Sequence, residues 1–201
     1  MRVTRRRLIV AATTTLAGGT VAVPVVWRKP EATAASPQIF TLAAGEAGDL
    51  KQVGAIVPRY PPAPPGEAQF FDGEGAARRI ADFAGQGLVL NLWATWCVPC
   101  VVEMPALQAL ARALAADRIA VLPLSSDRGG AAVVRRFFAS HDIQGLGVWL
   151  DPKGEAARAW GARGLPTTLI VDRKGREVAR VEGPIDWASA ATIVEVRRLV
   201  G

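Results

Sequence analysis

The chain of 201 residues contains two cysteines, Cys97 and Cys100, which are separated by two residues. The apolar run from Val89 to Trp93 precedes them and predicts a buried strand, and a helical pattern begins at Val101. A cysteine pair with this spacing, placed between a strand and a helix, is typical of redox-active dithiols. The order of strand, dithiol and helix also predicts a fold in which β and α elements alternate.

The basic charge is concentrated at the N-terminus. The formal net charge is +6, and residues 1–34 hold six arginines and lysines against Glu31, a balance of +5. The rest of the chain therefore carries +1, and it shows no stripe of basic residues interleaved with aromatic ones. We expect no binding to nucleic acid.

Residues 1–34 have the order of an export signal. Arginines within residues 2–7 stand before residues 8–26, which carry no charge, and Ala32-Thr33-Ala34 resembles a cleavage site. As a helix, residues 8–26 would reach about 28 Å, close to the ~30 Å hydrocarbon core of a bilayer. We predict a cleaved signal peptide or an N-terminal membrane anchor, with the dithiol outside the cytoplasm.

The remaining chain divides by composition into a linker and a domain. Residues 35–67 are rich in Ala, Pro and Gly, and the prolines of residues 61–65 predict a stiff, extended spacer. Residues 68–201 predict one α/β domain with an antiparallel finish. The expected strands are 68–71, 87–93, 119–125, 147–150, 167–171 and 176–181; the expected helices are 75–83, a long one from 101, 131–141, 155–160 and a last one that Asp186 N-caps and that ends at Leu199.

The expected position of the cysteines explains how they would react. A helix N-terminus carries unpaired N–H groups and a partial positive charge, which favour a thiolate. We therefore expect Cys97, at the cap, to attack a partner disulfide and Cys100, one turn inside, to resolve the mixed disulfide. Zinc would need two further ligands beyond the single histidine, His141, and covalent haem would need a histidine where Val101 stands.

Three motifs resemble the TlpA- and ResA-like thiol-disulfide oxidoreductases of the thioredoxin superfamily, TlpA most closely. They are Trp-Ala-Thr-Trp-Cys-Val-Pro-Cys at 93–100 with Glu103 and Pro105, Gly-Leu-Pro-Thr-Thr at 164–168 with an Asp and a Gly downstream, and Gly-Pro at 183–184 with Trp-Ala-Ser at 187–189. The resemblance covers about residues 68–201. It implies a thioredoxin fold, a central mixed β-sheet flanked by helices, with an extra helix-strand insertion.

The resemblance also implies roles for individual residues. Pro166 is expected to be a cis-proline beside the dithiol, leaving the backbone of Leu165 free to pair with an extended substrate; otherwise it is an ordinary loop proline. Glu103 lies one helical turn after Cys100, where a buried acid would have a raised pKa and could move protons; otherwise it is a glutamate that the helix dipole favours. Asn91 stands where thioredoxins have a buried aspartate.

The remaining aromatic residues are assigned to surface or core. Trp96, Val98 and Pro99 beside the cysteines are expected to contact the partner, and Trp93 to pack in the core. The core and the insertion are expected to hold the other large aromatic side chains, namely Phe137, Phe138, Trp149 and Trp160.

Together these points predict an extracytoplasmic enzyme on the periplasmic side of a bacterial inner membrane, reducing disulfides in partner proteins. The resemblance implies monomers with no cofactor beyond the Cys97–Cys100 disulfide, a membrane thiol reductant as electron donor, and cytochrome oxidase assembly factors or apocytochrome as partners. Thr167 after Pro166 departs from the cytochrome c biogenesis signature and favours the oxidase branch.

Two alternatives remain open. A peroxiredoxin-type peroxidase would place a proline four residues before Thr95, where Asn91 stands. A copper chaperone or scaffold without turnover would use the two cysteines as ligands, with no histidine nearby.

Overall fold

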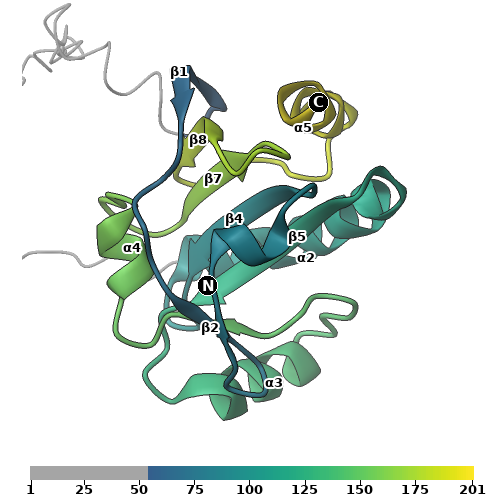
Figure 1. Cartoon of the computed structure of the whole chain (residues 1–201). Coiled ribbons are helices and arrows are strands. Elements are labelled where there is room, and N and C mark those ends of the chain that lie inside the picture. Colours follow the sequence, from purple (N-terminus) through teal and green to yellow (C-terminus); the bar gives the residue numbers. More distant parts are fainter. Residues whose placement is uncertain (1–53) are drawn as a thin grey trace, which may run out of the picture. The chain divides into compact units, whose positions relative to one another are not determined.

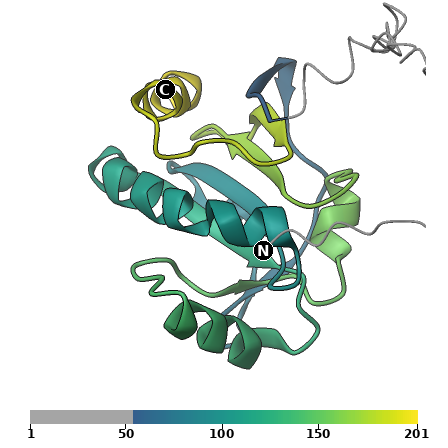
Figure 2. The same cartoon turned by 180° about the vertical axis from the view of Figure 1, so that it is seen from behind.

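The computed structural model describes residues 54–201. The predicted signal or anchor at 1–34 and most of the predicted linker, residues 35–53, lie outside the described residues. Eight strands form one mixed sheet in the order β1-β8-β7-β4-β5-β6-β2-β3, with helices on both faces (Figures 1 and 2). The predicted fold class, a central mixed sheet flanked by helices, is confirmed.

The centre of the sheet is β4 (Gly87–Trp93), in which every residue is buried. It pairs in parallel with β5 (Ile119–Ser125) and antiparallel with β7 (Thr167–Val171). The helix α2 (Val98–Leu114) makes the crossover from β4 to β5. These strands have the predicted bounds, because a strand covered on both faces is a continuous apolar run in the sequence.

Successive side chains of β4 contribute to two separate cores. Val89 and Trp93 join α2, α3 (Gly130–Ser140) and α5 (Ala190–Val200) on one face. Leu88, Leu90 and Leu92 join α4 (Glu155–Ala159) and the 3₁₀ turn η1 (Ile80–Phe83) on the other. Asn91 lies on the face of Val89 and Trp93, since side chains alternate along a strand. This alternation places a polar residue on the side of the sheet that α2 covers.

The helix α2 and the 3₁₀ turn η2 (Ala115–Asp117) that follows it make a stretch apolar enough to resemble a membrane span. Among residues 54–201, Val98–Asp117 is one helix whose length and composition would allow it to cross a bilayer. Its buried residues include Met104, Leu107 and Leu110, which belong to the first core. The stretch is the core helix of the domain.

The prediction of a linker up to residue 67 was wrong for its last part. Residues Val57–Ala63 form β1, which pairs antiparallel with β8 (Glu177–Glu182) at one edge of the sheet. The prolines do favour an extended chain, and at an edge a residue without an N–H can still belong to a strand. The domain therefore includes residues before Ala68.

Two further predictions need correction. The expected helix 75–83 is the short strand β3 (Ala77–Arg78) followed by η1, and β3 pairs with β2 (Phe70–Asp72). Ser189, not Asp186, is the N-cap of α5, because the Ser189 side chain accepts a hydrogen bond from the backbone N–H of Thr192 at 3.1 Å.

The insertion between β5 and β7 consists of α3, β6 (Trp149–Leu150) and α4. The Phe138 ring stacks on Trp93 with centroids 5.9 Å apart, and Trp149 and Trp160 both make edge contacts with Phe70. Phe137 and Phe138 are buried as well. The aromatic residues that the sequence assigned to the core and the insertion therefore lie there.

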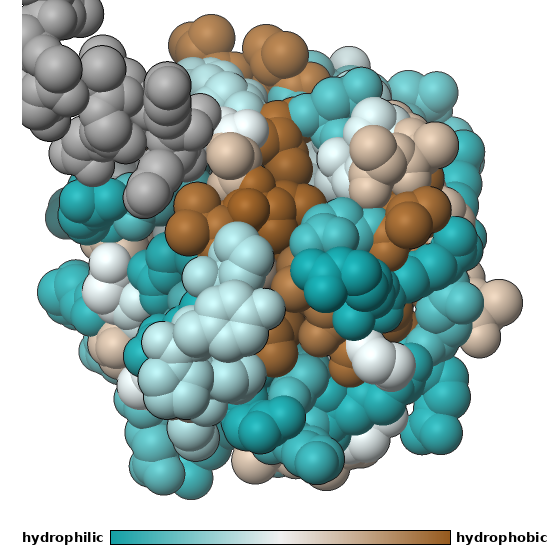
Figure 3. All heavy atoms as spheres, turned by 90° about the horizontal axis from the view of Figure 1, so that it is seen from above, coloured by the Kyte–Doolittle hydropathy of each residue, from teal (hydrophilic) through white to brown (hydrophobic). Residues whose placement is uncertain are grey.

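The end of the molecule that carries β1 and α5 shows a strip of apolar surface bordered by hydrophilic side chains (Figure 3). Partly buried apolar residues from these segments, such as Ile56, Ile193 and Leu199, pack against the first core. Tyr60 of β1 and Val194 of α5 are exposed large side chains. The first core thus comes close to solvent at this end.

Candidate active site

Cys97 and Cys100 form a disulfide at the start of α2, with their Cα atoms 5.3 Å apart. Cys97 is the N-cap residue of the helix, and Cys100 lies in its first turn. Cys97 is 6% exposed and Cys100 is fully buried, so Cys97 is the cysteine nearer to solvent. The structure thus places both cysteines at the predicted helix tip, where unpaired N–H groups favour a negative charge on sulfur.

The loop between β4 and α2 is fixed by Asp127, a residue that the sequence analysis missed. Its carboxylate accepts hydrogen bonds from the Thr95 N–H at 2.9 Å, the Thr95 hydroxyl at 2.7 Å and the Ser125 hydroxyl at 2.7 Å. Asp127 is 5% exposed. Its position just after β5 was the available signal, since β4 and β5 are parallel and both end at the edge of the sheet that carries the dithiol.

Exposed apolar side chains lie close to the two cysteines along the chain. Trp96 is 69% exposed, Val98 is 73% exposed and Val102, one turn further along α2, is 74% exposed. Pro99 between the cysteines is exposed too. Exposed apolar side chains gathered at one place are typical of a surface that contacts another molecule. We call Trp96, Val98, Pro99 and Val102 the apolar collar.

Glu103 is a buried acid one turn after Cys100, as the resemblance implied. Its Oε1 accepts a hydrogen bond from Asn91 Nδ2 at 2.8 Å, and its Oε2 accepts one from Trp187 Nε1 at 3.0 Å. Burial raises the pKa of Glu103 from 4.5 to about 7, because the loss of water penalises the charged form more than these hydrogen bonds favour it. The carboxyl group therefore exchanges its proton near neutral pH.

The two donors that hold Glu103 come from distant parts of the chain. Asn91 lies on β4 and also donates to the Thr168 hydroxyl at 3.0 Å. Trp187, fully buried, lies in the segment before α5. Within residues 54–201, Asn91 Oδ1 is a buried oxygen without a hydrogen-bond partner. Asn91 was noted at the position of the thioredoxin aspartate and Trp187 within a motif, but a hydrogen bond from either side chain to Glu103 was not predicted.

The peptide bond between Leu165 and Pro166 is cis, as the resemblance implied. Pro166 precedes β7, and the register pairs Thr167 with Leu92, the residue before the last one of β4. Pro166 therefore comes to the edge of the sheet where β4 ends and the dithiol loop begins. Leu165 is partly buried and packs against both cores.

In the part of the chain that the structure describes, no three His, Cys, Asp or Glu side chains are grouped to hold a metal ion. Glu103 is the ionisable group of the site that lies one turn after the dithiol on α2. Disulfide, buried carboxyl and cis-proline are thus the chemical elements of the site.

The sequence model of the AhpC/TSA family matches residues 61–179, which include the dithiol and the cis-proline. The chain belongs to the AhpC/TSA family. The chain is 32% identical over 112 residues to the thiol-disulfide oxidoreductase ResA of Bacillus thuringiensis subsp. konkukian. It is 36% identical over 103 residues to the thioredoxin-like protein YneN of Bacillus subtilis.

These alignments cover parts of each protein. The ResA alignment spans 56% of this chain and 64% of the relative, and the YneN alignment spans 50% and 59%. The predicted resemblance to ResA-like thiol-disulfide oxidoreductases is confirmed, while the closer similarity to TlpA stays a prediction.

Solved structures show the same fold. A putative thiol:disulfide interchange protein DsbE from Chlorobium tepidum superposes with a TM-score of 0.59 at 23% identity, covering 69% of this chain and 99% of that one. A secreted thiol-disulfide isomerase from Corynebacterium glutamicum gives a TM-score of 0.60 at 21% identity, covering 72% and 91%. The thioredoxin-like fold that the resemblance implied is confirmed.

Proposed function

We propose that this protein is a thiol-disulfide oxidoreductase that reduces disulfides in partner proteins through Cys97 and Cys100. The observation that carries the proposal is a Cys97–Cys100 disulfide at a helix N-terminus, with the exposed apolar collar in the same stretch of chain and a buried acid one turn away. Helix tip, collar and acid supply what disulfide exchange needs: a stabilised thiolate, a surface for a partner and a group that transfers protons.

The reaction begins with the reduced dithiol. The Cys97 thiolate attacks one sulfur of the partner disulfide, forms a mixed disulfide and releases the other partner sulfur as a thiolate. The Cys100 thiolate then attacks Cys97 Sγ, closes the Cys97–Cys100 disulfide and releases the second partner sulfur. Two electrons have passed to the partner, and a dithiol reductant must restore the enzyme.

Glu103 supplies the proton transfer in this cycle. Cys100 is fully buried and must lose its proton before it can attack. A carboxyl group with a pKa of about 7 accepts a proton at neutral pH and returns it at little cost. The hydrogen bonds from Asn91 and Trp187 fix the orientation of the carboxyl group for this role.

The partner would lie on the apolar collar and along the backbone of Leu165 beside Pro166. An extended segment that pairs with free backbone groups next to the dithiol brings its disulfide to Cys97. Trp96, Val98 and Pro99 would then contact the side chains that flank the partner cysteine.

We further propose that the enzyme works on the periplasmic side of a bacterial inner membrane, as a monomer, in cytochrome maturation. The support is the signal or anchor character of residues 1–34, the similarity to ResA and the sequence resemblance to TlpA. A membrane thiol reductant would be the electron donor, and cytochrome oxidase assembly factors or apocytochrome the partners.

The first test is insulin reduction by the full chain with dithiothreitol as the electron source. We expect turnover by the wild type and none by Cys97→Ser. Cys100→Ser is the matched variant: when it is reduced, freed of dithiothreitol and then mixed with insulin, it should accumulate a mixed disulfide on Cys97. Turnover by Cys97→Ser, or no mixed disulfide with Cys100→Ser, would contradict the proposal.

The same preparations separate the two alternatives. Hydrogen peroxide consumption faster than insulin reduction would favour a peroxidase. Stoichiometric copper binding by the reduced protein without insulin reduction would favour a copper chaperone.

A separate experiment identifies the partner. We expect Cys100→Ser expressed in the host to capture a cytochrome oxidase assembly factor or apocytochrome on Cys97. If the captured proteins belong to neither class, the role in cytochrome maturation is contradicted.

A further inference from the structure

The segment between α4 and β7, residues 160–166, ends at cis Pro166 and is called here the proline loop. At its start the helix α4 ends with Gly161 in the left-handed backbone conformation, at φ +67°. The Ala162 N–H there donates a hydrogen bond to Ala157 O at 2.9 Å. Near its end the Thr167 hydroxyl donates to Gly164 O at 2.7 Å. Each end of the loop is therefore hydrogen-bonded to the element beside it, α4 at the start and β7 at the end.

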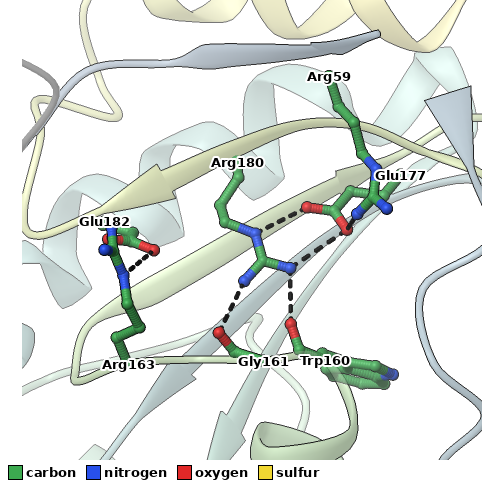
Figure 4. Close-up of polar contacts among 7 residues, drawn as sticks. All are labelled: Arg59, Trp160, Gly161, Arg163, Glu177, Arg180 and Glu182. Atoms are coloured by element: carbon green, nitrogen blue, oxygen red, sulfur yellow. Dashed lines mark hydrogen bonds and ion pairs between the residues drawn. The ribbon is translucent and has the colours of Figure 1, made fainter. Parts of the chain in front are cut away.

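Arg180 of β8 connects the sheet to the start of this loop. Its Nη2 donates to Trp160 O at 2.7 Å, and its Nη1 donates to Gly161 O at 3.3 Å (Figure 4). Its Nε donates to Glu177 Oε1 at 2.8 Å on the other side. The guanidinium thus lies between a carboxylate of its own strand and two carbonyls of the loop, a geometry that suits the planar fork of arginine.

Glu177 holds Arg180 in this orientation. Its side chain is 1% exposed, and its second partner is Arg59 of β1, whose Nη1 lies 2.7 Å from Glu177 Oε2. A buried carboxylate needs such pairing because water does not reach it. Three elements therefore meet at Glu177: β1, β8 and, through Arg180, the proline loop (Figure 4).

A second ion pair lies two residues further along β8. Glu182 accepts hydrogen bonds from Arg163 in the middle of the loop. Side chains two apart on a strand lie on the same face, so Arg180 and Glu182 contact the loop from one side of β8. Gly183, just after the strand, donates its N–H to Pro166 O at 2.9 Å. The strand β8 and the position after it thus contact the proline loop at its start, middle and end.

We propose that Arg180 is a positioning residue that sets the proline loop, and with it the backbone of Leu165, for binding of a protein disulfide substrate. The inference rests on the proposed function. Arg180 touches neither cysteine in any contact of the structure; it binds the loop at Trp160 and Gly161, four to five residues before Leu165. Its effect should therefore fall on partner binding, not on the reactivity of the sulfurs.

The test compares Arg180→Gln and Arg180→Lys with the wild type in the full chain. Insulin reduction gives KM and kcat for a protein disulfide, and alkylation of reduced Cys97 by iodoacetamide reports the thiolate alone. Arg78→Gln is the matched control, because Arg78 donates two hydrogen bonds to Asp72 at the opposite edge of the sheet.

We expect Arg180→Gln to raise KM for insulin about tenfold, with kcat and the alkylation rate within about twofold of the wild type. Arg180→Lys keeps the charge beside Glu177 but not the fork, so it should fold and raise KM by a smaller factor. Arg78→Gln should leave all three values unchanged.

Folded Arg180 variants with the wild-type KM would overturn the inference. So would a fall in the alkylation rate, which would place Arg180 in the chemistry of the dithiol. Where Arg180→Gln does not fold, Arg180→Lys alone decides between these outcomes. If the wild type itself does not reduce insulin, the proposed function fails, and this result is distinct from a failure of the role of Arg180.

Discussion

Replacing Glu103 with glutamine tests the central electrostatic feature of the site. Burial raises the pKa of Glu103 from 4.5 to about 7 in the folded, oxidised protein. Between these values the folded protein keeps a proton that the unfolded chain has released, so the free energy of unfolding falls as the pH rises through this window. Each pKa unit is worth about 1.4 kcal/mol, so the loss amounts to about 3 kcal/mol.

The assay is urea unfolding of the oxidised full chain and of Glu103→Gln between about pH 4.5 and 8.5. Glutamine keeps the shape and can still accept the hydrogen bond from Asn91. The difference in unfolding free energy, wild type minus variant, isolates the carboxyl group because the other titrating groups cancel. We expect this difference to fall by about 3 kcal/mol across the range, mostly below pH 7.

Glu195→Gln is the control with the opposite sign. The hydrogen bond from Arg198 lowers the pKa of Glu195, so its contribution to stability is present above the unfolded pKa and is lost as the pH falls. The difference in unfolding free energy between the wild type and Glu195→Gln must therefore stay level or rise with pH. If the difference for Glu103 is likewise flat to within about 0.5 kcal/mol, the carboxyl group is not desolvated as described and the reasoning is refuted.

Three further predictions follow from single contacts. Trp187→Phe removes a donor that favours the ionised form of Glu103, so the midpoint of the pH profile for insulin reduction should move up by about one unit, and a downward move would contradict this. Asp127→Ala leaves the Thr95 N–H, the Thr95 hydroxyl and the Ser125 hydroxyl without an acceptor and should lower the urea unfolding free energy by about 3 kcal/mol, whereas Glu67→Ala on the exposed surface should change it little. A Cβ on Gly87 would lie 2.2 Å from a methyl carbon of Val200, so Gly87→Ala should lower the melting temperature by an amount equivalent to about 2 kcal/mol, and an unchanged temperature would count against this packing.

The sequence predicted those parts of the fold that depend on local patterns. The apolar runs of β4, β5 and β7 marked the buried strands with their observed bounds. The strand β1 was missed because its prolines are as compatible with a free spacer as with an edge strand, and its pairing with β8 joins residues more than a hundred positions apart.

The site, too, was predictable where it depends on local sequence and not where it depends on packing. The cysteine spacing and the helix start are local, so the dithiol followed from the sequence alone. The cis state of the bond before Pro166 followed from the resemblance and not from spacing, since most peptide bonds before proline are trans. The contacts of Glu103 with Asn91 and Trp187 span 12 and 84 positions and depend on how the sheet and helices pack.

The pairing of β1 with β8 determines where the domain can be cut. A fragment beginning at Ala68 would lack β1, leaving β8 as an open edge and Glu177 without Arg59. Bare edges recruit strands from neighbouring molecules, so such a fragment should aggregate, whereas one beginning at Gly54 retains the closing strand. Truncation boundaries for isolated-domain work therefore belong upstream of the proline-rich stretch.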